Sequence, residues 1–93
     1  MALSKNSNSG NSTLSTATSE VLPANGGRVG LALTNTDASI VMSVSFGEDA
    51  VATEGIVLGG GDTVVLDNVV PTQAVNAIAA SGTPVLAYTE FLA

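Results

Sequence analysis

The acidic residues Glu48, Asp49 and Glu54 come nearest to a chemical site in this 93-residue chain. Two carboxylates can share acid–base work, and carboxylate oxygens alone can hold Ca²⁺. Their spacing matches no known calcium loop, and a solvated acidic loop is the simpler interpretation. The sequence therefore predicts no metal-binding residue here and leaves weak cation binding by the loop open.

Nucleophilic catalysis finds no support in the side chains that are present. The chain has no histidine to take a proton from serine, and no cysteine to supply a thiolate or a disulfide. The glycine run 59–61 is not followed by the Gly-Lys-Ser/Thr of a phosphate-binding loop. We expect a protein that is not an enzyme and has no catalytic, cofactor-binding or metal-binding residues.

Composition favours contact with other proteins. Charged residues make up 11% of the chain, well below the roughly 25% of a typical soluble domain. The chain has a net charge of −6 and therefore lacks the cluster of basic residues that binds nucleic acids or anionic membranes. No apolar run reaches the roughly 18 residues of a membrane span. A chain this poor in charge leaves apolar surface exposed, which marks an interface, so we expect a homo-oligomer or docking on a larger assembly.

Arg28 is the only basic residue after Lys5. On an acidic domain it can form a structural ion pair, or it can contact a partner protein. The carboxylates that we consider as its ion-pair partners are those of Glu20, Asp67 and Glu90.

Alternating apolar and polar residues predict β-strands. We expect residues 28–46 to form a central hairpin, with strands 29–34 and 40–46 joined by the turn Asn35-Thr36-Asp37-Ala38. Further strands are expected at 13–22, 54–58, 63–67, 75–80 (whose alanines also suit a helix) and 84–92. Glycine, proline, asparagine and aspartate end these segments. The prediction is an all-β fold of about seven short antiparallel strands, in a single sandwich or jelly-roll-like barrel over residues 13–93.

Residues 1–12 are rich in serine, asparagine and glycine, and have no apolar core of a signal peptide. This composition predicts a flexible N-terminal arm, which either stays loose or orders against a partner. The residues that we expect to bind a partner are Leu3, Lys5, Leu14, Arg28, Tyr88 and Leu92.

A series of turn residues and small apolar residues covers positions 20–92. It consists of Leu22-Pro23-Ala24-Asn25, Arg28, Leu31, Asn35, Phe46-Gly47, Gly55-Ile56, Leu58, Gly61, Leu66-Asp67, Val70-Pro71-Thr72, Ala74-Val75, Ala77-Ile78-Ala79-Ala80, Gly82-Thr83 and Glu90. This series resembles small all-β structural proteins of tailed bacteriophage virions, namely capsid decoration or cement proteins and head-fibre bases. The chain departs from them at residues 59–61, where a proline is expected before the last glycine.

The resemblance implies a structural virion protein that binds the outer surface of a phage capsid and stabilises it. Its expected partners are the major capsid protein and further copies of itself, with a trimer favoured over a dimer, and no nucleic acid or membrane. We expect it to be made in the host bacterial cytoplasm and to lie on the outer capsid surface. The alternative is a head-fibre or tail module that binds a receptor or glycan, although the aromatic residues Phe46, Tyr88 and Phe91 all fall in core-like strands.

Overall fold

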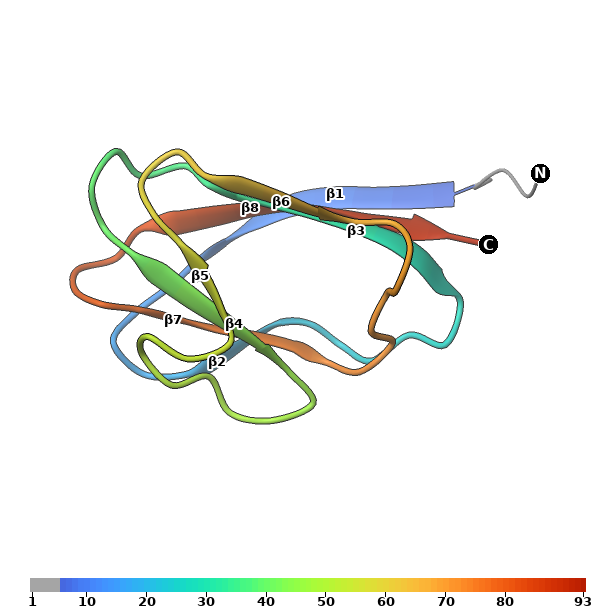
Figure 1. The fold of residues 1–93 in the computed structure, drawn as a ribbon, viewed down its shortest axis with the longest axis horizontal. Coiled ribbons are helices and arrows are strands. Elements are labelled where there is room, and N and C mark those ends of the chain that lie inside the picture. The colour runs from blue at the N-terminus through green and yellow to red at the C-terminus, as the bar shows by residue number, and fades with distance from the viewer. Residues whose placement is uncertain (1–5) are drawn as a thin grey trace.

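The computed structural model describes residues 6–93 as a sandwich of two four-stranded sheets (Figure 1). Sheet A has the strand order β1-β8-β3-β6, sheet B has the order β2-β7-β4-β5, and all neighbours are antiparallel. The strands are β1 (Asn6–Thr13), β2 (Ser19–Leu22), β3 (Arg28–Asn35), β4 (Met42–Phe46), β5 (Ile56–Leu58), β6 (Thr63–Leu66), β7 (Val75–Ala79) and β8 (Val85–Leu92). The all-β sandwich is confirmed. Residues 6–93 contain no helix that could cross a membrane.

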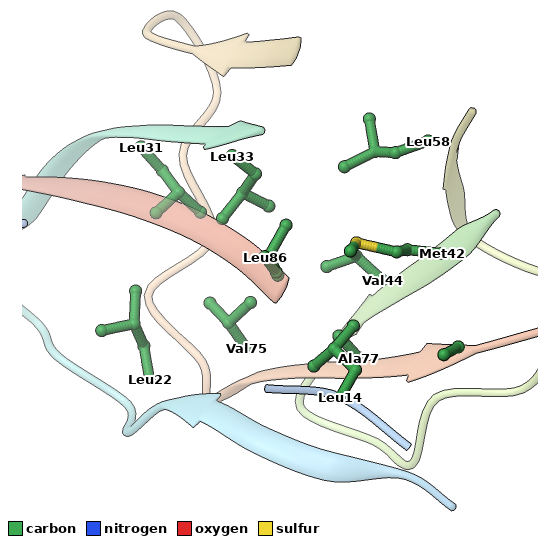
Figure 2. Packing of buried hydrophobic residues seen from close by; sticks show 11 residues of the cluster. Leu14, Leu22, Leu31, Leu33, Met42, Val44, Leu58, Val75, Ala77 and Leu86 are labelled. Carbon is green, nitrogen blue, oxygen red and sulfur yellow. The ribbon is translucent and has the colours of Figure 1, made fainter. Parts of the chain in front are cut away.

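The core lies between the sheets and follows from the period of two along each strand. The leucines of β3 and β8 point inward from sheet A. They pack against Met42 and smaller aliphatic side chains from β4 and β7 of sheet B (Figure 2). Each fully buried leucine contributes about 1.5 to 3 kcal/mol. The apolar residues with no exposed surface are Leu14, Leu31, Leu33, Met42, Val44, Val75, Ala77 and Leu86.

The predicted central hairpin is wrong, because its two arms lie in different sheets. Strand β3 pairs with β6 and β8, whereas β4 pairs with β5 and β7. The turn after Asn35 carries the chain across the sandwich. The buried amide of Asn35 donates hydrogen bonds of 2.7, 3.0 and 3.0 Å to the carbonyl oxygens of Ile40, Leu58 and Gly59. Alternation identifies a strand but does not identify its neighbours.

Residues 6–12 differ from the expected flexible arm. They form most of β1, which pairs with β8 in a continuous register from Asn6 opposite Leu92 to Thr13 opposite Val85. Backbone hydrogen bonds make this contact, so the strand does not need apolar side chains of its own. The expected strand 13–22 is divided into the end of β1, a connection and β2, while the four later strands lie within one or two residues of prediction. Residues 1–5 lie outside the described part of the chain.

Candidate interaction surface

Within residues 6–93, none of the strand residues that point outward from sheet A is charged. Because the leucines of β3 and β8 point inward, the residues that alternate with them point away from the core. Two hydroxyl pairs lie on this face, Ser9 with Thr89 at 3.0 Å and Thr34 with Thr63 at 2.9 Å. From β1 to β6 the outward residues are Ser7, Ser9, Asn11, Thr13, Val85, Ala87, Thr89, Phe91, Gly30, Ala32, Thr34, Thr63 and Val65.

Apolar side chains stand out on this side of the molecule. Val65 on β6 is 61% exposed and Phe91 on β8 is 36% exposed. The Phe91 ring lies over Gly30, where an added Cβ would be 3.1 Å from a ring carbon. Val29, 46% exposed, sits beside them at a β-bulge in the β3–β8 register. The described strands of sheet A therefore present an uncharged and partly apolar face to their surroundings.

Sheet B is covered on its outer side by the loop between β4 and β5, residues 47–55 (Figure 1). Ser43 points outward from β4 yet is only 2% exposed. Its hydroxyl accepts a 2.8 Å hydrogen bond from the Thr53 N–H, and the Ala50 N–H donates to the Thr18 hydroxyl at 2.8 Å. The two faces of the sandwich are thus unlike, since no loop packs on the outward residues of sheet A, whereas residues 47–55 cover part of sheet B and leave Val57 on β5 47% exposed.

The acidic loop residues Glu48, Asp49 and Glu54 belong to this cover and are all exposed. No group of three potential metal ligands lies together within residues 6–93. Glu20 also faces outward, from β2, opposite Asn76 of β7. These four carboxylates therefore lie on the sheet B side, whereas Asp62 and Asp67, which are also exposed, lie at the two ends of β6 at the edge of sheet A.

Arg28 is a structural residue in the interior. Its side chain is 0% exposed, and its Nε lies 3.5 Å from Oε1 of Glu90, one of the three expected partners. That contact is too long for a hydrogen bond, but Glu90 accepts one of 3.1 Å from the Asn25 amide. The guanidinium also donates three bonds of 2.7 to 2.9 Å, to the carbonyl oxygens of Pro71, Gln73 and Pro23. It ties the β2–β3 and β6–β7 connections to β8.

The other residues expected at a partner contact are scattered. Leu14 is fully buried between the sheets, where its N–H donates to the Pro84 carbonyl at 2.8 Å, so the structure places it in the core. Tyr88 is half-buried on β8 and packs against the core. Leu92 is half-buried at the end of β8. Leu3 and Lys5 lie outside the described residues.

Asp37 accepts backbone hydrogen bonds in the turn that follows β3. The backbone N–H groups of Ser39 and Ile40 each donate to its carboxylate at 2.8 Å. These backbone hydrogen bonds, first from Ser39 and then from Ile40, lower the pKa of Asp37. A shallow hollow of about 270 Å³ lies over residues 65–69, and Asp67 is its only ionisable lining residue. Neither feature gathers the converging polar groups of a ligand site.

The feature that sequence reasoning missed is the free edge of β1. No strand lies beyond it among residues 6–93, so one side of its backbone is left without a neighbouring strand. The only signal in the sequence is negative: eight residues, Asn6–Thr13, without a charge or a proline. That composition predicts an arm, loose or ordered against a partner, rather than a strand of the sandwich.

Comparison with known proteins informs the fold. No protein-family model matches the chain, and no curated protein matches it. A solved chain from the disulfide-linked pili that form Bacillus endospore appendages superposes with a TM-score of 0.53, covering 95% of this chain and 87% of that one. The two sequences are 11% identical. Identity this low shows a shared fold and nothing more.

Proposed function

We propose that this chain is a structural virion protein that binds the outer surface of a phage capsid and stabilises it, as a decoration or cement protein. The observation that carries the proposal is the difference between the two faces of the sandwich. Among residues 6–93 the outward strand residues of sheet A are uncharged and partly apolar, whereas residues 47–55 cover part of the outer face of sheet B. A protein that works by contact needs one such face and no reactive groups.

In this proposal sheet A lies against the major capsid protein and the acidic side faces outward. Val29, Val65 and Phe91 supply the apolar contact, each contributing on the order of 1 kcal/mol when it becomes covered. The protein is made in the host cytoplasm, and self-association on the shell is part of the proposal. Many weak contacts of this kind add up when many copies coat one particle.

We also propose that the sandwich is a jelly roll. The orders β1-β8-β3-β6 and β2-β7-β4-β5 support this, because both sheets are built from strands taken alternately from the two ends of the chain. Jelly rolls of eight strands in two sheets recur in viral capsid and lectin domains. Fold alone does not assign function, so this is support for the virion proposal by analogy.

A second candidate is a subunit of a filamentous appendage, which the likeness to a pilus chain supports. The present chain has no cysteine, so such a filament would be held without disulfides. A head-fibre or tail module that binds a receptor or glycan has less support. Sugar sites use exposed aromatic platforms, and Phe91 is the only exposed aromatic residue among those described.

The first test is the copy number of the chain in purified virions, measured by quantitative mass spectrometry. A decoration protein is present in tens to hundreds of copies, whereas a fibre or tail module is present in few. Electron microscopy of the purified chain separates the appendage candidate, which would form filaments without a capsid. A low copy number, or absence from the virion, contradicts the proposal.

The second test locates the capsid-binding face. Val65→Glu should weaken binding to shells that lack this protein by more than about tenfold, because a carboxylate buried without a partner costs over about 1.4 kcal/mol. Val57→Glu is the matched control, since Val57 is 47% exposed on the outer side of sheet B. Equal effects of the two substitutions would contradict docking through sheet A.

A further inference from the structure

The four edge strands of the sandwich are not equally protected. Native proteins guard exposed edges with charge, proline, bulges or short length, because an open edge pairs with other strands. Strand β6 has four residues and lies between Asp62 and Asp67. Strand β2 has four residues, and its register shifts between Glu20 and Leu22. Strand β5 has only three residues.

Strand β1 lacks every one of these devices. It has eight residues, no charge, no proline and an unbroken register with β8. Its residues are Ser, Asn, Gly and Thr, and all but Ser12 are exposed. Among the four edges of the described chain, β1 is therefore the one open to a further strand.

The hydrogen bonds show which backbone groups of β1 point outward. The Leu14 N–H donates to the Pro84 carbonyl oxygen at 2.8 Å, and these two residues directly follow the pair of Thr13 with Val85 in the β1–β8 register. In an antiparallel pair the bonded residues alternate, so the even-numbered residues of β1 face β8. The N–H and C=O groups of the remaining residues face the open edge, and these are Ser7, Ser9, Asn11 and Thr13.

We propose that β1 pairs antiparallel with β1 of a second copy, across a two-fold axis that passes through Gly10. In this register Ser7 lies opposite Thr13 of the second copy, and Ser9 lies opposite Asn11. Every outward N–H and C=O of both strands then finds a partner. The axis stands perpendicular to the sheet, so the bare outer faces of the two sheets A become one continuous surface.

A second copy fits this edge better than an unrelated strand for two reasons. The outward residues are spaced symmetrically about Gly10, so the edge is complementary to itself. Each chain carries a net charge of −6, yet β1 has no carboxylate, so two copies meet where they repel least. Gly10 also suits the axis, where facing Cα atoms are only about 4.5 Å apart.

The resulting dimer is weak in solution. An eight-residue strand is about 25 Å long, and pairing along its edge alone covers less than a standard protein interface. Two-fold pairing gives a dimer rather than the trimer that we expected for self-association. The inference does not rest on the proposed function, because it concerns the purified chain, and failed capsid binding would leave it standing.

Cross-linking tests the pairing, and the absence of native cysteine makes engineered thiols unique. Ser9→Cys and Asn11→Cys variants are mixed and oxidised; their facing Cα atoms would be about 5.5 Å apart, within disulfide range. The mixture should form covalent dimers at least about tenfold faster than a mixture of Ser9→Cys with Val65→Cys, on the opposite edge of sheet A. Equal rates would overturn the pairing. Faster linkage of Ser9→Cys with itself would overturn the Gly10 register.

A proline substitution tests the backbone directly. Asn11→Pro removes an N–H that points outward, so no bond to β8 is lost and circular dichroism should show an unchanged fold. Asn11→Ala keeps the N–H and is the control. By analytical ultracentrifugation, Asn11→Pro should dimerise at least about tenfold more weakly than Asn11→Ala, as expected when backbone pairing supplies the affinity. Equal dimerisation of the two variants, or a native chain that stays monomeric at millimolar concentration, would overturn the proposal.

Discussion

Removing the Arg28 side chain should be among the most damaging single changes to this fold. The guanidinium holds three backbone carbonyl oxygens and lies beside Glu90, all in the interior. Arg28→Met keeps most of the buried volume and deletes the charge and all five donors. Glu90 keeps the 3.1 Å hydrogen bond from the Asn25 amide but loses the positive charge beside it.

The size of the effect follows from what is left unpaired. Breaking a buried ion pair by removing one partner costs about 3 to 5 kcal/mol, since the other charge stays buried. A chain of this length has about 5 to 14 kcal/mol of total stability. Arg28→Met should therefore remove about a fifth of the free energy of unfolding or more. Arg28→Lys should lose less, about 1 to 3 kcal/mol, because one ammonium cannot span all three carbonyls.

Urea unfolding followed by circular dichroism measures these changes. With an m value of about 1 to 1.5 kcal/mol per molar urea, Arg28→Met should lower the midpoint by at least about 2 M. Glu48→Gln, which neutralises an exposed carboxylate, is the control and should leave the midpoint within about 0.5 M. If Arg28→Met shifted the midpoint no more than Glu48→Gln, the contacts of Arg28 with the three carbonyl oxygens and Glu90 would not stabilise the fold, and the reasoning would fail.

Three further predictions concern turns. Gly55→Ala should lower the free energy of unfolding in urea by about 2 to 4 kcal/mol, because Gly55 has φ +76° and the new Cβ would meet the Val44 carbonyl oxygen. Gly61→Ala should lower it by only about 1 kcal/mol, because Gly61 has φ +77° but lies in open space. Asn35→Ala should cost about 2 to 4 kcal/mol, because buried carbonyls lose their donor; a smaller loss would mean that water replaces it. Because its pKa is lowered in the folded state, Asp37 stabilises the fold above its unfolded pKa and loses that contribution as pH falls through its folded pKa. The free energy of unfolding of Asp37→Asn should therefore depend less on pH below about pH 4. An unchanged slope of the free energy of unfolding against pH would refute this.

The sequence predicts strands better than it predicts their neighbours. Strands β5 to β8 are correct to within one or two residues because alternation and turn residues are local signals. The β3–β4 hairpin is wrong because a local pattern says nothing of which sheet a strand joins. The crossing is seen in the strand pairings, and the buried amide of Asn35 stabilises it by bonding carbonyl oxygens beyond the turn.

The interaction surface was harder to predict for a similar reason. The choice of Glu90 for Arg28 needed the β3–β8 register, which brings residues far apart in the chain together. Leu14 looked isolated in a polar stretch, yet its position between the sheets buries it completely. Strand β1 has no apolar period at all, because its pairing partner and not its side chains holds it in place.

The four carboxylates on the sheet B side have a consequence at the scale of a whole particle. If copies sit with sheet A inward, Glu20, Glu48, Asp49 and Glu54 all point to the medium, and a coated shell acquires a dense negative charge. Such particles would migrate faster toward the anode than uncoated ones, and would stay dispersed at low salt because their double layers repel over about 30 Å at 0.01 M ionic strength. The coat would then act on how virions behave toward one another as well as on how each shell holds together.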